Sequence, residues 1–237
     1  ISLAFRIPRV FAMCLPSVYQ SQGVIFVGGG PYVMQPGIDL SGYLTYTPFY
    51  TNPLAFSTSE YYIQVNSIDI DGEKIPIYSG STEFLFQKLV TMNTLIPYTV
   101  MRTSIYNQFT SLFIEKAKAM NIFRVASVAP FGVCFDSTNM RGSPVGALVP
   151  TIGLVLHREN VVWNIHGRNS MVRISDKVSC LGFVDGGSDY DTRMLVIGGY
   201  QLENKLIEFN LAKKRLGFTS TAISRFPIDC SNFRFQQ

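Results

Sequence analysis

Residues 196–218 read Val-Ile-Gly-Gly-Tyr-Gln-Leu-Glu-Asn-Lys-Leu-Ile-Glu-Phe-Asn-Leu-Ala-Lys-Lys-Arg-Leu-Gly-Phe, and this stretch decides the fold. It holds most of two segments of strand composition, Lys205–Asn210 and Arg215–Thr219, which Leu211–Lys214 connects. Towards the N-terminus, similar short segments bounded by turn residues predict strands within 11–30 and at 43–51, 61–70, 73–77, 131–135, 151–156, 161–166, 170–174, 180–184 and 194–198. Strands at this regular spacing predict an all-β fold.

One segment, near residues 102–120, predicts the main helix of the chain. Thr103 or Ser104 is expected to cap its start. The side chains that recur at the three- and four-residue spacing of one helical face are Ile105, Phe109, Leu112, Phe113 and Lys116.

The composition excludes several classes of protein. Of 237 residues, 47% are hydrophobic and 15% are charged, so a sizeable folded core is expected. The formal net charge of +4 is only mildly basic. The densest basic clusters, at Lys213–Arg215 and at Lys116 and Lys118, are interpreted as solvated faces, and no nucleic acid is expected as a partner.

The four cysteines, Cys14, Cys134, Cys180 and Cys230, are widely separated and have no histidine at ligand spacing, so a zinc site is not expected. Such cysteines in a β-rich chain fit two disulfides formed in an oxidising compartment, and the spacing leaves three pairings open. Four buried thiols in a cytosolic protein are the alternative.

The sequence shows no targeting or membrane segment. No apolar run reaches the roughly 18 residues that a membrane span needs, so no membrane association is expected. The chain opens at Ile1 without the features of a signal peptide. If the protein is secreted, we expect that processing made this N-terminus or that the chain is part of a longer protein. No Asn-x-Ser/Thr sequence occurs, so N-glycosylation is not expected.

Patterns for catalysis, metals or cofactors are weak. His157 and His166 lie on neighbouring predicted strands, and no Gly-x-Ser-x-Gly motif accompanies them. The Asp-containing segments 69–71 and 185–189 lack the spacing of a calcium loop and indicate turns. Gly28–Gly30 precedes no predicted helix, which favours a tight bend over a phosphate-binding loop. We therefore expect neither a cofactor nor a metal.

Several segments together resemble the C-terminal lobe of pepsin-like aspartic proteases. Residues 196–218 are similar to the strand, short helix and hairpin that end this lobe. Pro150–Leu156 is similar to its Pro-x-Ile strand, and Leu95–Met101 with the helix from Thr103 is similar to the catalytic-loop strand and the helix after it.

Ser127–Phe135 (Ser-Val-Ala-Pro-Phe-Gly-Val-Cys-Phe) narrows the resemblance to a proteolytically inactive plant group. This group comprises the xylanase inhibitors of cereal grain, the xyloglucanase inhibitors related to carrot extracellular dermal glycoprotein, and the basic 7S globulins and γ-conglutins of seeds. The further segments that fit it are Phe11–Pro16, Val161–Ile165, Asn169–Val172, Val184–Ser188 and Cys230–Phe235. The resemblance implies that residues 1–237 form a single C-terminal lobe, with the N-terminal lobe absent from this chain.

The resemblance also implies that the protein is not an enzyme. Pepsin-like catalysis needs two carboxylates, one from each lobe, that share a proton and a water molecule. In such proteases the second one belongs to an Asp-Thr/Ser-Gly motif, and Asn93-Thr94-Leu95 stands in its place here. An amide does not act as a general acid or base, and no carboxylate lies between Glu83 and Glu115. Asn93 is thus expected at the second catalytic Asp position.

Inhibitors of this group insert loops of the C-terminal lobe into the active-site cleft of a microbial glycoside hydrolase, where a basic side chain meets the paired carboxylates. The resemblance places one such arginine at Arg225, with Phe226 beginning a spacer that is two residues longer than usual. At the second position this chain has Pro144, and Arg141 lies three residues away. Arg225, Arg141 and Phe226 are therefore the candidate binding residues, and ordinary exposed loop arginines are the alternative.

A seed storage or stress protein without a hydrolase target is the rival interpretation. Some seed globulins are cleaved near the Ser-Val-Ala-Pro motif, and this chain runs through Ser127 uncut, which favours the inhibitor branch. Both interpretations imply a secreted protein, in the cell wall or in a storage vacuole, whose first partner is the N-terminal lobe or a companion chain. With the resemblance as guide, the expected disulfides are Cys14–Cys230 and Cys134–Cys180.

Overall fold

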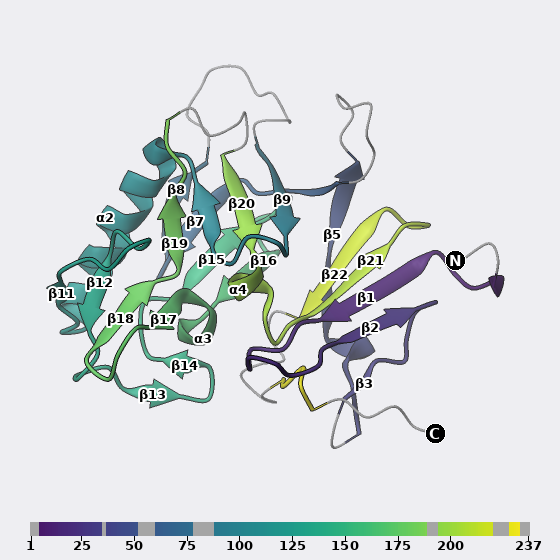
Figure 1. Cartoon of the computed structure of the whole chain (residues 1–237). Helices are drawn as coiled ribbons and strands as arrows, with labels where there is room; N and C mark the ends of the chain where they lie inside the picture. The colour runs from purple at the N-terminus through teal and green to yellow at the C-terminus, as the bar shows by residue number, and fades with distance from the viewer. Residues whose placement is uncertain are drawn as a thin grey trace. The chain divides into compact units, whose positions relative to one another are not determined.

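The structure is a computed structural model that describes residues 5–34, 37–51, 60–77, 88–188, 194–219 and 228–232 (Figure 1). It divides into two compact units. Unit 1 consists of residues 1–63 and 202–237, and unit 2 of residues 64–201. Unit 2 is therefore inserted in sequence between the two parts of unit 1.

The core of unit 1 is an antiparallel sheet in which strands from both of its parts alternate. Its strand order is β6-β5-β22-β21-β1-β2. The strands are β1 (Val10–Cys14), β2 (Val24–Val27), β5 (Leu44–Thr51), β6 (Tyr61–Gln64), β21 (Leu206–Asn210) and β22 (Arg215–Thr219). The remaining elements of unit 1 are β3 (Val33–Met34), β4 (Ile38–Asp39) and the 3₁₀ helix η1 (Leu40–Tyr43). In Figure 1, the yellow hairpin β21–β22 lies beside the purple strand β1.

The hairpin β21–β22 confirms the strands predicted for residues 205–219. Every residue of β21 is buried, including the polar Glu208 and Asn210 beside the apolar Leu206, Ile207 and Phe209. In the turn, the Asn210 side-chain oxygen accepts a hydrogen bond from the Lys213 backbone N–H at 2.9 Å, and Lys214 takes a left-handed backbone conformation with φ of 48°. At the same end of the sheet, where the Gly28 N–H donates to the carbonyl of Val10 and Val10 pairs with Asn210, Gly28 and Gly29 also have positive φ, as the predicted tight bend requires.

Unit 2 contains several sets of hydrogen-bonded strands. One has the strand order β19-β10-β20-β9, a second β16-β15-β7-β8, a third β11-β12-β18-β17, and β13 pairs with β14. The strands are β7 (Ser67–Ile70), β8 (Glu73–Pro76), β9 (Leu89–Asn93), β10 (Thr99–Met101), β11 (Arg124–Val125), β12 (Cys134–Asp136), β13 (Gly142–Ser143), β14 (Gly146–Ala147), β15 (Ile152–Val155), β16 (Val162–Ile165), β17 (Met171–Arg173), β18 (Val178–Leu181), β19 (Phe183–Asp185) and β20 (Leu195–Gly198). The short helices are α3 (Gly167–Ser170) and α4 (Gly199–Leu202).

The main helix, α2, spans Thr103–Ala119, which confirms the predicted helix. Its apolar face is buried: Phe109 and Phe113 are fully covered, and Phe109 packs against Phe183 of β19 with ring centroids 4.9 Å apart. The predicted cap is wrong. The N-cap residue is Arg102, and its side chain makes no capping hydrogen bond. The Thr103 hydroxyl donates instead to the Asp185 carboxylate at 2.7 Å.

Two disulfides with the expected pairing are present. Cys14 of β1 is bonded to Cys230, with Cα atoms 5.3 Å apart, and Cys134 is bonded to Cys180 between the adjacent strands β12 and β18. All four cysteines are fully buried. None of the helices in the described part of the chain has both the length and the apolar composition needed to cross a membrane.

Candidate functional site

The loop after β9 carries Asn93, which the sequence predicts at the place of the second carboxylate of a pepsin-like protease. Asn93 is the last residue of β9 and pairs with Gly198 of the parallel strand β20. Its side-chain oxygen accepts a hydrogen bond from the Leu95 backbone N–H at 2.9 Å, so the amide holds the turn. The Leu95 side chain is 91% exposed. Residues 93–98 include no carboxylate, so this loop offers no acid–base chemistry of the protease kind.

Backbone contacts with β20 and α4 fix this loop. The Gly199 N–H donates to the Ile96 carbonyl and the Tyr200 N–H to the Pro97 carbonyl, both at 2.8 Å. A Cβ atom at Gly198 would collide with the Tyr98 backbone, so only glycine permits this close approach. The glycine pair Gly198-Gly199 therefore allows the backbone of this segment to lie directly against the loop backbone.

A buried amide supports the loop from below. The Gln201 side-chain oxygen accepts hydrogen bonds from the Thr99 N–H at 2.9 Å and from its hydroxyl at 2.7 Å. The Gln201 amide nitrogen donates to the carbonyls of Gly182 at 2.8 Å and Asn169 at 3.0 Å. Because Gln201 is fully buried and its amide is satisfied by four partners, this network is a rigid and non-titrating scaffold.

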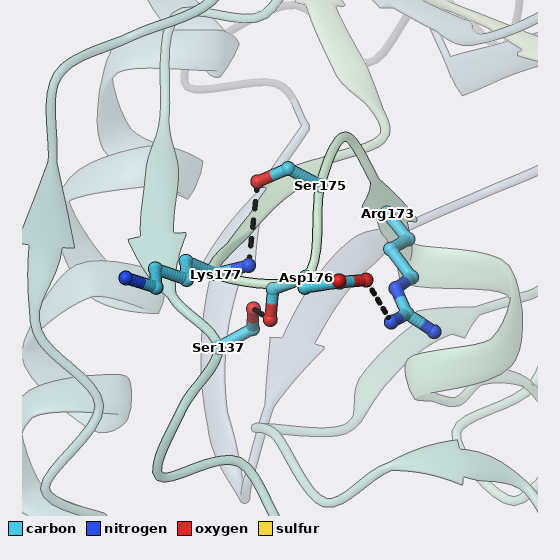
Figure 2. Close-up of polar contacts among 5 residues, drawn as sticks. All are labelled: Ser137, Arg173, Ser175, Asp176 and Lys177. Carbon is cyan, nitrogen blue, oxygen red and sulfur yellow. Dashed lines mark hydrogen bonds and ion pairs between the residues drawn. The ribbon is translucent and has the colours of Figure 1, made fainter.

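The second candidate element is the loop that follows β12, residues 136–148. Its start is tied to the turn between β17 and β18 (Figure 2). The Ser137 backbone N–H donates to the Lys177 carbonyl at 2.9 Å, and its hydroxyl donates to the Asp176 carbonyl at 3.3 Å. Figure 2 also shows the Asp176 carboxylate paired with Arg173 at 2.6 Å, so the turn carries its own ion pair. Because the disulfide from Cys134 of β12 to Cys180 of β18 lies directly before this loop, the loop leaves the sheet from a fixed base.

The far end of this loop is held by α3. The Arg168 N–H donates to the Val145 carbonyl, and the Arg168 guanidinium donates to the Pro144 carbonyl, both at 2.8 Å. Gly146 has φ of +96°, and a Cβ atom there would collide with the Arg168 backbone. Pro144, at the position where related inhibitors are expected to carry an arginine, is thus fixed against α3.

Arg141 lies just before β13 and is exposed. Its carbonyl accepts a hydrogen bond from the Leu148 N–H at 2.7 Å, which closes the base of the loop. None of the ion pairs found among the described residues includes Arg141. It lines a groove of about 600 Å³ at the C-terminal end of α2, and the other lining residues are Met120, Asn121, Ile122, Asn139 and Leu148. The groove therefore combines a cation with exposed apolar side chains.

Arg225 and Phe226 lie outside the described residues. The structure does describe both ends of their segment: Thr219 ends β22, and Cys230 is bonded to Cys14. This segment belongs to unit 1 and Arg141 to unit 2. The two candidate arginines therefore belong to different units of the chain.

Two ionisable groups in unit 1 were not singled out by sequence reasoning. Burial raises the pKa of Glu203 to about 7 and lowers the pKa of Lys205, which is fully buried, to about 8. Between them, Asn204 donates its amide to the Ser17 hydroxyl at 2.7 Å and accepts from the Cys230 N–H at 3.0 Å. Nothing in the residue pattern signals this burial, because Lys205 looks like the polar edge of a strand.

The described residues offer little to a metal ion. In the described ranges, no three His, Cys, Asp or Glu side chains gather as a metal site would require. Burial and the nearby Arg158 lower the pKa of His157, which lies in the turn between β15 and β16.

The chain is similar to proteins of one known family. The model of the family described as xylanase inhibitor C-terminal matches residues 60–220, more than half of the chain. The protein named probable aspartic proteinase GIP2 of Nicotiana benthamiana is 45% identical over 245 residues, covering 99% of this chain and 55% of that protein. Gamma conglutin 1 of Prunus dulcis is 40% identical over 233 residues, covering 98% of this chain and 51% of that protein.

Among solved structures, the crystal structure of edgp superposes with a TM-score of 0.91 at 42% identity, covering 100% of this chain and 59% of that one. These likenesses agree with a mostly β lobe of the pepsin-like kind with one main helix. The chain spans about half the length of the curated relatives it matches.

Proposed function

Because this chain belongs to the xylanase inhibitor C-terminal family, we propose that it is a non-proteolytic protein that inhibits microbial cell-wall-degrading glycoside hydrolases. Its relatives include gamma conglutins and proteins named probable aspartic proteinases, so the family name alone does not decide the activity. The proposal places binding on loops of unit 2 and unit 1, at Arg141 and Arg225.

The composition of the loop after β9 supports a non-enzymatic role. Asn93 stands where the second carboxylate is expected, and its amide already bonds the Leu95 N–H. Leu95 replaces the glycine that would follow in an active protease, and its side chain is almost fully exposed. A protease activity would need a proton carrier that this loop lacks.

The observation that carries the inhibitory role is the fixed loop beside Arg141. Ser137 anchors its start and Arg168 holds its far end, so little conformational entropy is lost when the loop binds a partner. A guanidinium in such a loop can bridge a carboxylate with two hydrogen bonds, and glycoside hydrolases carry two carboxylates around the bond they cleave. The exposed apolar side chains of Met120 and Leu148 add contact area beside the charge.

Inhibition assays against a family 11 xylanase and a family 12 endoglucanase test this function. If one of them is inhibited, Arg225→Ala is expected to weaken binding by roughly 2–5 kcal/mol, because the hydrolase carboxylates lose a buried partner. Arg141→Ala is expected to weaken it by less, since Arg141 lies three residues from the expected position.

The matched control is Arg158→Ala, an exposed arginine in the turn between β15 and β16, which should leave inhibition unchanged. Equal and negligible losses for all three variants would mean that these arginines are ordinary surface residues.

A storage or stress protein of seeds is the second candidate function. It is favoured by the 40% identity to gamma conglutin 1 of Prunus dulcis and by the basic sequence pI of about 8.9. If neither hydrolase is inhibited, this candidate takes precedence.

Both candidates fit secretion, and two fully buried disulfides support passage through an oxidising compartment. We propose the cell wall or a storage vacuole as the location. The first partner is proposed to be the N-terminal lobe, as a part of the same protein or as a companion chain.

A further inference from the structure

The groove at the C-terminal end of α2 lies wholly within unit 2. Half of its six lining side chains are polar, namely Asn121, Asn139 and Arg141. The other three, Met120, Ile122 and Leu148, are apolar. Its volume of about 600 Å³ is in the range of pockets that bind small ligands.

Both walls of the groove are held by backbone hydrogen bonds. On the helix side, the Ile122 N–H donates to the Ala117 carbonyl at 2.9 Å, and Asn121 takes a left-handed conformation with φ of 60°. On the loop side, the Met140 N–H donates to the Ser137 carbonyl at 3.2 Å. The groove is therefore formed before a ligand arrives, which lowers the entropy lost on binding.

The three polar side chains of the groove are available to a ligand. Within the described ranges, none of these side chains makes a hydrogen bond or an ion pair, and all three residues are exposed. The Arg141 guanidinium offers a fork of donors that matches a carboxylate. The amides of Asn121 and Asn139 each donate and accept, as the hydroxyl groups of a sugar also do. A ligand with a carboxylate and several hydroxyl groups can therefore satisfy all three side chains.

The apolar side chains of the groove suit the same ligand. Ile122 is buried, whereas Met120 and Leu148 are 42% and 44% exposed. Aliphatic side chains can pack against the C–H groups of a sugar ring, and the unbranched Met120 side chain adapts to the shape of what it contacts.

Charges near the groove favour an anionic ligand. Lys118 and Arg124 lie in the sequence on either side of residues 120–122, and both are exposed. Ion pairs among the described residues include neither of them. The nearby Asp136 carboxylate is already engaged, because it accepts hydrogen bonds from the Thr138 N–H at 2.9 Å and from its hydroxyl at 2.7 Å. Several cations close together attract a polyanion more strongly than one does.

We propose that this groove binds a uronic acid unit of an acidic polysaccharide. Arg141 binds the carboxylate with two hydrogen bonds. Asn121 and Asn139 bond the hydroxyl groups of the ring, and the exposed apolar side chains contact its C–H groups. Lys118 and Arg124 attract the carboxylates of neighbouring units in the same polysaccharide.

A peptide segment fits the groove less well. Peptides that bind in extended form add to an open strand edge, and those that bind as helices need an apolar groove. None of the six lining residues belongs to a strand, and half of the lining side chains are polar. The proposal uses Arg141 but does not rest on hydrolase inhibition, so either of the two can fail alone.

Calorimetric titration of the full-length protein that contains these residues tests the proposal without any hydrolase. Oligogalacturonate should bind at ~0.15 M salt. Its methyl ester, a neutral cello-oligosaccharide and a polyglutamate of equal charge should each bind at least about tenfold more weakly. Absence of oligogalacturonate binding would overturn the proposal, and so would any of the three other probes binding as tightly.

Charge variants place the binding in the groove. Arg141→Gln removes the cation but keeps a polar side chain, and should weaken oligogalacturonate binding at least about tenfold. Asn139→Asp adds a like charge to the groove and should also weaken it. Arg158→Gln, in the turn between β15 and β16, makes the same change of net charge at an exposed arginine and should leave the affinity within about twofold. Equal losses for Arg141→Gln and Arg158→Gln would overturn the assignment of the site.

Side-chain amide signals in NMR spectra locate the ligand in the unaltered protein. The NH₂ signals of Asn121 and Asn139 should shift during the titration, whereas that of Asn160, an exposed amide beside Arg158, should not. Shifts confined to other amides would overturn the proposal. If Arg141→Gln does not fold, these shifts still decide the question.

Discussion

At the scale of single residues, three amide side chains of this protein hold the backbone by hydrogen bonds. The Asn93 side-chain oxygen accepts a hydrogen bond within a turn, and the Gln201 side-chain oxygen accepts one from Thr99, directly after the same loop. The Asn204 side-chain oxygen accepts one from the Cys230 backbone N–H. None of these amides titrates, so they hold the backbone at every pH without the repulsion that carboxylates would bring.

Asn93 leads to a prediction about proteolysis. The purified protein should not cleave casein between acid and neutral pH. Asn93→Asp should not create cleavage, because Leu95 would still stand where an active protease is expected to have glycine. A fluorogenic peptide assay with and without pepstatin measures this. Pepstatin-sensitive turnover by the unaltered protein would contradict it.

Glu203 leads to a prediction about pH. Its pKa is raised from 4.5 to about 7, so the folded protein keeps a proton that the unfolded chain releases. Stability should therefore fall as the pH rises from about 4.5 to 7 and then level off. Burial lowers the pKa of Lys205 to about 8, so this side chain changes the pH dependence of stability only above pH 7.

Glu203→Gln should remove this loss, making the protein about 1–3 kcal/mol more stable than the unaltered one at pH 7 while the two agree near pH 4. Urea unfolding at several pH values measures it. Glu159→Gln, at an exposed carboxylate, is the control and should keep the original pH profile.

At the scale of elements, the sequence predicts those helices and strands whose structure is decided by neighbouring residues. The hairpin β21–β22 and the helix α2 follow from local patterns, and both were predicted. The strand predicted over residues 61–70 is interrupted, because the N–H groups of Val65 and Asn66 donate to the carbonyls of Lys88 and Val155. Partners this distant in sequence leave no local signal.

The candidate site shows the same limit. The resemblance selected Arg141, but the groove beside it forms only when the end of α2 meets the loop after β12. The fixation of Pro144 by Arg168, 24 residues away, is likewise a tertiary contact that no spacing rule reveals.

The pairing of β13 and β14 gives an element-scale prediction. Gly146→Ala should destabilise the protein by about 2–3 kcal/mol, because alanine disfavours the positive φ and its methyl group meets the Arg168 backbone. Gly142→Ala is the matched control in the neighbouring strand, where a Cβ atom meets nothing within 4 Å. Thermal unfolding compares the two, and equal shifts would contradict the packing described here.

At the scale of the whole molecule, the two disulfides close very different loops. Cys14 and Cys230 are 216 residues apart, and Cys134 and Cys180 are 46 apart. On the chain-entropy account, the first constrains the unfolded chain more, by roughly 5 kcal/mol against roughly 4 kcal/mol.

Replacing both cysteines of one pair by serine tests this order. Cys14→Ser with Cys230→Ser should lower the free energy of unfolding more than Cys134→Ser with Cys180→Ser does. Denaturant unfolding of the two double variants measures the difference. The reverse order would show that strain or residual structure outweighs chain entropy.

The insertion of unit 2 between the two parts of unit 1 also decides how a cut chain would behave on a gel. Residues 126–130 are exposed, and a single nick at Ser127 would leave fragments of 127 and 110 residues that Cys14–Cys230 keeps joined. Such a nick would leave one band without a reducing agent and give two bands with it. A preparation that runs as one species under oxidising conditions can therefore already be a two-chain protein.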